Sequence, residues 1–130
     1  MQSGVIDQRA ARKVLIVEDN ELNMKLFNDL LEAHGYTTLQ TRDGLEALSI
    51  ARQHRPDLIL MDIQIPLIDG YEVTRRIKAD PALRSIPIIA VTSHAIGGGE
   101  EKARAAGCDD FVAKPYSPRQ LLTKIRQYLS

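Results

Sequence analysis

Four short runs of apolar residues constrain the fold of this chain more than any other feature of its sequence. Three of them are almost continuously apolar, which is typical of strands buried on both faces in a parallel sheet. A weaker run, YTTLQT at 36–41, alternates and carries threonines, which favours an edge strand. The four runs are KVLIV (13–17), DLILM (57–61), IPIIAV (86–91) and DFVA (110–113).

The segment between the first run and the weaker one has the apolar spacing of a helix. Asn20 suits its start, and Gly35, directly after His34, suits the left-handed residue that ends many helices. The spacing predicts that its apolar side chains share one buried face. These side chains are Leu22, Leu26, Phe27, Leu30 and Leu31.

Capping patterns mark the starts of the other helices. Asp43 and Asp69 each precede a glutamate by three residues, a variant of the capping box. Ser117 followed by Pro118 predicts the start of the last helix. A short helix near 100–106 follows three glycines. The predicted buried stripe of the last helix is Leu121, Leu122, Ile125 and Leu129.

Strands and helices therefore alternate five times along the chain. Helical crossovers of this length join parallel strands in a right-handed sense and cover both faces of the sheet. The prediction is a doubly wound α/β domain with a five-stranded parallel sheet. In such domains, ligands bind beyond the carboxyl ends of the strands.

Composition excludes several classes of protein. The chain has 130 residues with 17 basic and 17 acidic side chains, so its net charge gives no bulk attraction to nucleic acid or to an anionic membrane. No run is long enough for a membrane span or a signal peptide, and we expect a cytoplasmic protein. The single cysteine, Cys108, has no partner for an internal disulfide and no metal-type spacing.

The most informative side chains stand directly after the predicted strands. Because the carboxyl ends of parallel strands share one edge of the sheet, we expect three carboxylates, two hydroxyls and an ammonium group to gather there. These residues are Glu18, Asp19 and Asn20 after the first strand, Asp62 after the strand at 57–61, Thr92 and Ser93 after the strand at 86–91, and Lys114, followed by Pro115, after the last strand.

The chemistry of this group points to a phosphoryl site. Three neighbouring carboxylates repel one another, and a divalent cation removes that conflict. Oxygen ligands without a nearby histidine or cysteine favour Mg²⁺. Lys114 adds a positive contact for an anion, Thr92 adds a hydroxyl, and Asp62 can act as the nucleophile.

Each of these residues also has a structural interpretation. An aspartate at a strand end often caps a helix or forms a turn, which we accept for Asp43 and Asp69. Asp19 and Asn20 are open to the same interpretation, because Asn20 can cap the first helix. A single threonine after a strand can reflect β-propensity, and a single lysine is usually solvated. Their coincidence at four strand ends favours a functional site.

On these motifs, residues 13–129 resemble the receiver domain of bacterial two-component response regulators. The resemblance is carried by Glu18–Asp19 after VLIV, by Asp62 within LILMDIQIP, by Thr92 after IIAV and by AKP at 113–115. Within that family, the opening third of the chain is most similar to a stand-alone regulator of cell division and polarity.

The resemblance implies a flavodoxin-like sheet of order 2-1-3-4-5 with five helices. It also implies a receiver domain over 13–130, while residues 1–12, which are polar and weakly patterned, are predicted to form a flexible arm. The protein would be a single-domain switch whose output is protein–protein contact or phosphate relay. Its partners would be sensor histidine kinases and phosphatases or a histidine phosphotransfer protein, and the unphosphorylated chain would be a monomer.

Roles for individual residues follow from the same resemblance. Asp62 would accept the phosphoryl group from a phosphohistidine, Lys114 would contact that group, and the Thr92 hydroxyl would bind it after transfer. The carboxylates of Asp19 and Asp62 would bind Mg²⁺. Glu18 would bind it through water and Gln64 through its backbone carbonyl.

Three further expectations concern the switch and its loops. Phe111 falls where the family places an aromatic residue that turns inward on activation. Ser93 would keep access to Asp62 open, and the Lys114–Pro115 bond would be cis. The glycines at 97–99 depart from the usual helical sequence, so that helix should begin late after a mobile loop.

The main alternative is a small Mg²⁺-dependent phosphohydrolase with an aspartyl nucleophile. Enzymes of the haloacid dehalogenase type need a second acid two residues after the nucleophile, where this chain has Gln64. A flavin-binding role is also disfavoured, since the acidic EDNELN segment after the first strand would repel a phosphate. We therefore do not expect an enzyme beyond its own phosphoryl transfer and dephosphorylation.

The partner surface is a further hypothesis. A phosphohistidine must reach Asp62 over the carboxyl edge of the sheet, beside the first helix and the loop after Lys114. Met24 falls off the Leu22–Leu26–Leu30 stripe, so it is predicted to be an exposed contact, with core packing as the alternative. The predicted contact residues are Asn23, Met24, Phe27 and Tyr116.

Overall fold

A computed structural model of the chain describes residues 12–92, 98–114 and 117–129. In this part of the chain, strands and helices alternate as predicted. The strands are β1 (Lys13–Val17), β2 (Thr37–Thr41), β3 (Leu58–Asp62), β4 (Ile88–Thr92) and β5 (Asp110–Ala113). The helices are α1 (Glu21–Ala33), α2 (Gly44–His54), α3 (Gly70–Ala79), α4 (Glu100–Ala106) and α5 (Pro118–Leu129).

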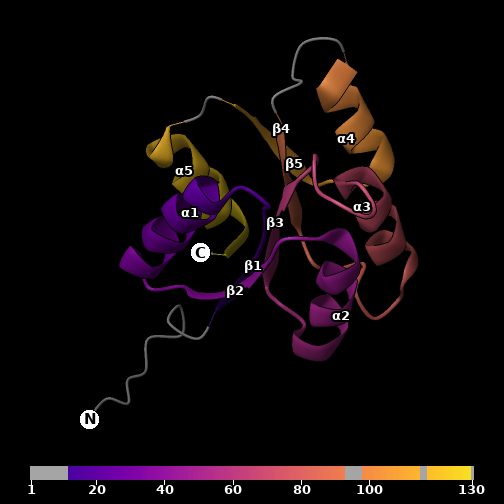
Figure 1. Cartoon of the computed structure of the whole chain (residues 1–130), viewed down its shortest axis with the longest axis horizontal. Helices are drawn as coiled ribbons and strands as arrows, with labels where there is room; N and C mark the ends of the chain where they lie inside the picture. Colours follow the sequence, from indigo (N-terminus) through magenta and orange to yellow (C-terminus); the bar gives the residue numbers. More distant parts are fainter. Residues whose placement is uncertain (1–11, 93–97, 115–116, 130) are drawn as a thin grey trace.

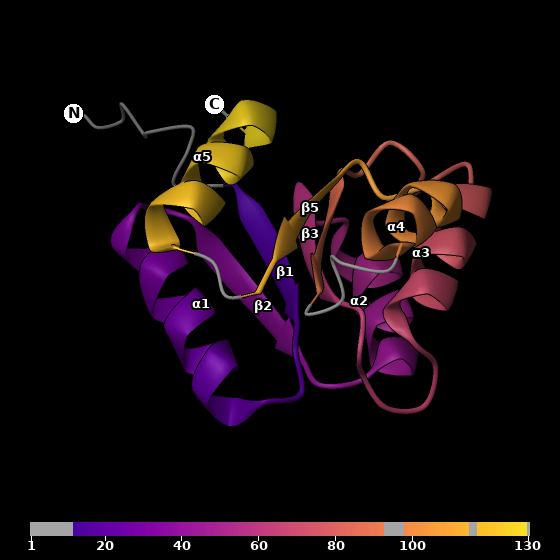
Figure 2. The ribbon, with the colours of Figure 1, turned by 90° about the horizontal axis from the view of Figure 1, so that it is seen from above.

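The strands form one parallel sheet in the order β2-β1-β3-β4-β5. Helices α1 and α5 cover one face of the sheet, and α2, α3 and α4 cover the other (Figures 1 and 2). The predicted doubly wound fold and its strand order are confirmed. None of the helices in the described ranges combines the length and the apolar character needed to cross a bilayer.

Burial explains the continuous apolar runs. Every residue of β3 and β4 is buried, because each of these strands has helices over both of its faces. β2 lies at the edge of the sheet, and most of its residues are exposed or half-buried, as its alternating sequence predicts. The core is thus divided into two apolar layers, one on each side of the sheet.

Side-chain caps fix where four of the helices begin. Each cap accepts a hydrogen bond from the backbone N–H three residues on, at 2.9 Å for Asn20, 2.7 Å for Asp43, 2.9 Å for Asp69 and 3.0 Å for Ser117. Such a cap stabilises a helix by about 1 kcal/mol. The predicted starts are confirmed. Helix α4 has no side-chain cap, and residues 98–99 directly before Glu100 form a π-helical turn, so the late start predicted from the glycines stays a prediction.

The prediction for the buried face of α1 is partly wrong. Its buried residues are Met24, Phe27 and Leu31, whereas Leu22 and Leu26 are 65% and 54% exposed. Both sets have helical spacing, so hydrophobicity alone could not choose between them. The fit of the helix against the sheet and α5 decides which stripe is buried. The predicted stripe of α5 is confirmed.

Several predictions fall outside the described residues. They concern residues 1–11 of the predicted arm, residues 93–97 of the predicted mobile loop with Ser93 among them, the Lys114–Pro115 bond and Tyr116.

Candidate functional site

The pairing of β1, β3 and β4 brings the acidic residues to one edge of the sheet. Val17 pairs with Met61, so the next residues on these two strands, Glu18 and Asp62, continue the same register. Asp62 in turn pairs with Val91 on β4. The strand ends therefore deliver two carboxylates side by side, as their positions in the sequence predict.

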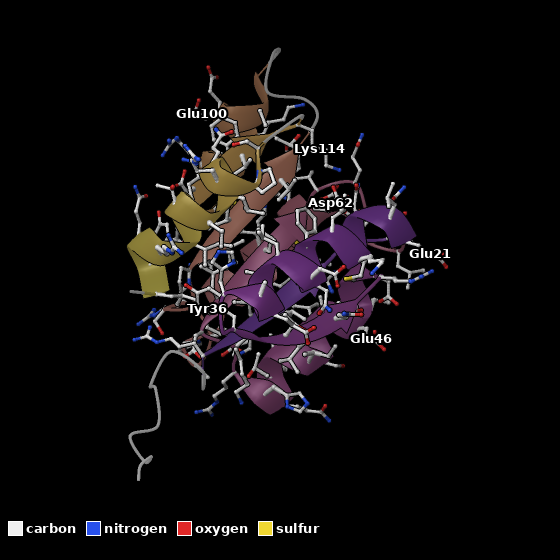
Figure 3. All side chains as sticks on the ribbon, turned by 90° about the vertical axis from the view of Figure 1, so that its left-hand side faces the viewer. Glu21, Tyr36, Glu46, Asp62, Glu100 and Lys114 are labelled. Atoms are coloured by element: carbon white, nitrogen blue, oxygen red, sulfur yellow. The ribbon has the colours of Figure 1, made fainter. Side chains whose placement is uncertain are left out.

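The pairing of β4 with β5 adds the basic residue. Thr92 pairs with Ala113, and the backbone N–H of Lys114 donates to the carbonyl of Thr92 at 2.8 Å. The Lys114 ammonium lies 3.6 Å from Oδ2 of Asp62 and 3.9 Å from Oε1 of Glu18. Figure 3 shows Lys114 beside Asp62. Lys114 thus lies within ion-pair range of both acids.

The three acids converge tightly. Glu18, Asp19 and Asp62 each offer a carboxylate oxygen, and these oxygens lie within 4.8 Å of one another. Glu18 and Asp62 are only 1% and 4% exposed, whereas Asp19 is exposed. The cluster is therefore open to solvent on the Asp19 side and closed on the side of the core.

Glu18 is held in an electrostatically unfavourable position. Its Oε2 accepts a hydrogen bond from the Asn20 N–H at 3.1 Å, but its buried Oε1 has no hydrogen-bond partner among the described residues. Burial, and after it the interaction with Asp62, raises the pKa of Glu18 from 4.5 to about 7, against the opposing effects of Asn20 and Lys114. A buried oxygen without a partner costs free energy unless something binds it.

This arrangement fits a divalent cation. A hard cation would satisfy the unpartnered oxygen of Glu18 and relieve the repulsion between the carboxylates. All three side chains offer oxygen ligands, which Mg²⁺ prefers. The cluster could therefore bind Mg²⁺, and the exposed Asp19 leaves room for water or for a ligand oxygen.

The loop between β3 and α3 orients the Asp62 carboxylate. The backbone N–H of Gln64 donates to Oδ1 of Asp62 at 3.0 Å, which leaves Oδ2 on the side of Lys114. At the base of the loop, the Gly70 N–H donates to the Ile63 carbonyl at 2.9 Å. A Cβ on Gly70 would lie 2.8 Å from the Asp62 carbonyl oxygen, so only glycine fits this close approach.

The tip of the same loop is strained. The N–H of Ile68 donates to the Pro66 carbonyl at 3.0 Å, and Leu67 between them has φ of 74°. This is a γ-turn with a positive φ, which is rare for a residue with a side chain. A non-glycine residue in such a conformation costs about 1–3 kcal/mol. The sequence did not predict this turn, because Pro66 before a non-glycine residue is no signal for it.

Two other predicted residues take their expected places in the fold. Thr92 ends β4 and is only 1% exposed. Phe111 lies on β5, half-buried, and packs against the apolar layer that carries α2, α3 and α4. Their proposed roles toward a phosphoryl group stay predictions.

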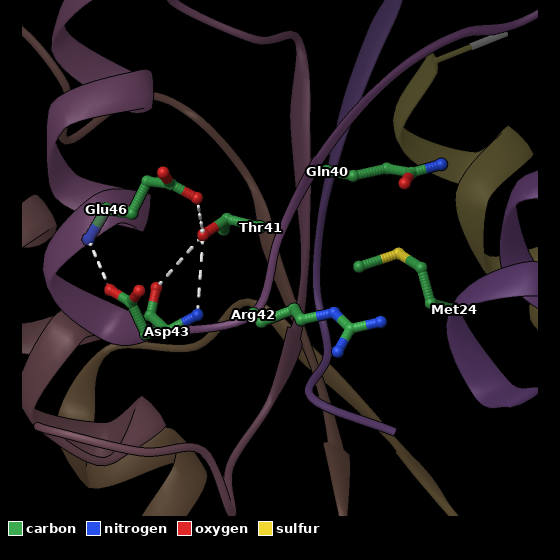
Figure 4. Close-up of a pocket in the computed structure, with 6 residues that line it drawn as sticks. All are labelled: Met24, Gln40, Thr41, Arg42, Asp43 and Glu46. Atoms are coloured by element: carbon green, nitrogen blue, oxygen red, sulfur yellow. Dashed lines mark hydrogen bonds between the residues drawn. The ribbon is translucent and has the colours of Figure 1, made fainter. Parts of the chain in front are cut away.

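The predicted docking residues on α1 need correction. Met24 and Phe27 are only 7% and 2% exposed, so the prediction that Met24 is an exposed contact is wrong and core packing is the correct alternative. The side chain of Met24 turns toward Gln40 and Arg42 at the edge of a surface pocket of about 370 Å³ (Figure 4). Asn23 is half-buried, so it stays a candidate contact.

The family model for the response regulator receiver domain matches residues 14–126. The chain belongs to this family. The matched residues include the five strands from Val14 on, together with Glu18, Asp19, Asp62 and Lys114 at the carboxyl edge of the sheet.

Relatives in Brucella match this chain along almost their whole length. The polar-differentiation response regulator DivK of Brucella anthropi is 58% identical over 118 residues, which cover 91% of this chain and 96% of the relative. DivK of Brucella ovis is 57% identical with the same coverage. The chain is therefore similar to DivK along almost its entire length.

Solved structures confirm the receiver fold. The receiver domain of a Pseudomonas aeruginosa sensor histidine kinase, described with a magnesium ion coordinated in its active-site cleft, matches with a TM-score of 0.86 and 36% identity over 92% of this chain and 98% of that one. The chemotaxis regulator CheY4 of Vibrio cholerae matches with a TM-score of 0.85 and 27% identity, covering 92% of this chain and 99% of that one.

Proposed function

We propose that this receiver domain accepts a phosphoryl group on Asp62 from a phosphohistidine of a partner protein. The observation that supports this most is the setting of Asp62 at the end of a buried strand. Its Oδ1 accepts the Gln64 N–H, and its Oδ2 lies 3.6 Å from the Lys114 ammonium among three converging acids. Oriented carboxylate, cation and acidic cluster are the parts that phosphoryl transfer needs.

In the proposed reaction, Oδ2 of Asp62 attacks the phosphorus atom. The new O–P bond forms as the P–N bond to the histidine breaks, and the imidazole nitrogen keeps the electron pair and takes up a proton. The Gln64 N–H holds the carboxylate in place, and Lys114 compensates the charge of the phosphoryl oxygens. The Thr92 hydroxyl is the proposed hydrogen-bond donor to the attached group.

Asp19 and Asp62 are the proposed side-chain ligands of Mg²⁺, with the Gln64 carbonyl as a further ligand and Glu18 bound to the ion through water. Bound Mg²⁺ supplies positive charge that offsets the repulsion between Asp62 and an incoming phosphoryl group. The unpartnered oxygen of Glu18 supports this assignment, as does the magnesium ion described for the Pseudomonas receiver domain.

The proposed output is a change in the binding surface. A phosphoryl group adds a charge of about −1.5 to −2 at neutral pH, enough to reorganise Thr92 and, through it, Phe111. The receiver domain over 13–130, with the arm over 1–12, would act in the cytoplasm as a monomer until it is phosphorylated. Its similarity to DivK supports a role in cell polarity or the cell cycle.

The proposed donor is a sensor histidine kinase, which would also act as the phosphatase, or a histidine phosphotransfer protein. The exposed side chains of Leu22 and Leu26 replace Met24 and Phe27 as the apolar contacts on α1. They lie within two turns of Asp19, beside Asn23, so a partner helix on this face would reach the carboxyl edge. Tyr116 stays part of this proposal.

Intact mass spectrometry after incubation with acetyl phosphate and Mg²⁺ tests the acceptor. The wild-type chain should gain the mass of one phosphoryl group, and Asp62→Asn should gain none. Asp69→Asn is a matched control, because Asp69 caps α3 outside the acidic cluster and should label like the wild type. Persistent labelling of Asp62→Asn would show that another residue is the acceptor.

Metal titration tests the proposed ligands separately. Asp19→Ala should abolish the Mg²⁺ dependence of labelling, and Glu18→Ala should weaken Mg²⁺ binding less. Equal Mg²⁺ affinity in both variants and the wild type would place the cation elsewhere.

A further inference from the structure

Leu67 combines two unfavourable properties at the rim of the site. It has a positive φ of 74°, and its side chain is 71% exposed. A strained residue inside a core can be stabilised by the contacts of its side chain, but an exposed leucine makes few such contacts. Glycine would fit this turn without strain. The stability of the fold therefore does not explain a leucine at this position, whereas a contact between its exposed side chain and a partner would explain it.

A second exposed leucine lies on the element that packs against this turn. Leu45, in the first turn of α2, is 48% exposed. The N–H of its neighbour Gly44 donates to the Pro66 carbonyl at 3.4 Å, and a Cβ on Gly44 would collide with Ile68. The start of α2 and the γ-turn are therefore packed directly together, and each presents an exposed leucine one residue away from this contact.

The two segments that carry the leucines contain acidic charges only, and Arg42, just before the first of them, is paired with Glu21 at 2.9 Å. Every charged residue within 43–47 and 63–73 is acidic. Asp43 and Asp69 cap their helices and Glu46 accepts from the Thr41 hydroxyl, while the side chains of Arg75 and Arg76 neutralise Glu72. A complementary surface would have an apolar recess flanked by lysine or arginine.

We infer that Leu67 and Leu45 form a second docking surface for the phosphohistidine donor, on the α2 side of the site. The inference rests on the proposed function and names a contact of that same site. Leu67 stands five residues after Asp62, in the loop whose Gln64 N–H orients the acceptor carboxylate, so a contact at Leu67 would belong to the same loop as the acceptor. This continuity with the acceptor, together with the acidic rim, favours a basic donor surface over other occupants.

Three substitutions of Leu67 separate binding from folding. Leu67→Gly removes the side chain and relieves the strain, Leu67→Ala removes most of the side chain and keeps the strain, and Leu67→Met keeps an apolar side chain. Transfer from an autophosphorylated histidine kinase that phosphorylates the wild-type chain should fall by about 10-fold in the Gly and Ala variants. It should stay near the wild-type rate in the Met variant.

Two further readouts distinguish the causes. The melting temperature of Leu67→Gly should not fall below that of the wild type, because the strain is relieved, and labelling by acetyl phosphate should be unchanged in all variants. Leu45→Ser should also slow transfer from the kinase. Added NaCl should slow that transfer in the wild type by screening the acidic rim.

Each result that would contradict the proposed docking surface points to a different explanation. Kinase transfer at the wild-type rate in Leu67→Gly and Leu45→Ser overturns it, while labelling by acetyl phosphate still upholds the acceptor. An equal loss of labelling from both donors would assign the turn to the chemistry and not to docking. Concentration-dependent self-association that the substitutions abolish would show that a second copy of the chain covers this surface. No labelling of the wild type at all would instead refute the proposed function.

Discussion

The charged groups at the two ends of the sheet differ in how well they are hydrogen-bonded. At the amino end, the Lys78 ammonium donates to Asp109 Oδ2 at 2.9 Å and to the carbonyls of Arg84 and Ile86 at 3.1 and 2.9 Å. The same Asp109 oxygen accepts the Ile88 N–H at 2.8 Å. Lys78 and Asp109 thus both have partners within hydrogen-bond distance, and together they tie α3 to the starts of β4 and β5.

At the carboxyl end, the charges are close but poorly satisfied. Lys114 is 3.6 Å from Asp62 and 3.9 Å from Glu18, both longer than a hydrogen bond, and Oε1 of Glu18 has no hydrogen-bond partner in the described residues. A buried charge of this kind destabilises a fold unless it is compensated. The charges of Lys78 and Asp109 at the amino end therefore stabilise the fold, whereas those at the carboxyl end are arranged to bind a ligand.

The largest expected effect is the pH dependence that Glu18 gives to stability. Its pKa is about 7 in the folded chain against 4.5, so the folded state binds more protons between these values. The contribution of Glu18 is therefore fully present below pH 4.5 and is lost as pH rises through 7, by about 3 kcal/mol. Glu18→Gln should remove this slope in urea unfolding measured without divalent cations.

Added Mg²⁺ sharpens this test. It should stabilise the wild type more at pH 8 than at pH 5, because the cation replaces the proton on Glu18. Glu18→Gln should show a smaller difference between the two pH values. The same pH slope in both proteins would mean that Glu18 is not the responsible group.

The next effect belongs to the amino end. Asp109→Ala leaves the Ile88 N–H and the Lys78 ammonium without their shared partner, so we expect a loss of about 2 kcal/mol in the free energy of unfolding. Labelling by acetyl phosphate at a temperature where the variant is folded should match the wild type. A change in the rate of labelling would show that the charged groups at the amino end also affect the site at the carboxyl end.

The comparison also shows what the sequence could predict. The continuous apolar runs were sufficient to predict the parallel sheet, because strands that are buried on both faces, as β3 and β4 are, have such runs. The residues after the strands were sufficient for Glu18, Asp62 and Lys114, because parallel strands end at one edge. Both conclusions depend on periodicity and topology alone.

Other features depend on three-dimensional fit. The two apolar stripes of α1 have equivalent spacing, so only packing shows that Met24 is buried and Leu26 exposed. The positive φ of Leu67 comes from the closure of its loop against α2 and has no signature in a residue that is not glycine. Gly44 and Gly70 each follow a capping aspartate, a pattern that could have pointed to close backbone approach.

The smallest expected effect lies at the carboxyl end. Gly70→Ala places a Cβ 2.8 Å from the Asp62 carbonyl and from Ile63 Cα, so the backbone must shift, and we expect a loss of about 1–2 kcal/mol. Unlike Asp109→Ala, this variant should also label more slowly with acetyl phosphate, since the loop orients Asp62. Wild-type labelling kinetics in Gly70→Ala would show that the loop tolerates the shift.

Locating the attached phosphoryl group tests the central claim most directly. An acyl phosphate is reduced by borohydride to an alcohol, so a phosphorylated aspartate becomes homoserine and can be located by peptide mass spectrometry. After labelling with acetyl phosphate and Mg²⁺, we predict homoserine at position 62, with Asp19 and Glu18 unmodified. Reduction at Asp19 or Glu18, or a labelled chain with no reducible aspartate, would contradict the assignment of Asp62 as the phosphoryl acceptor.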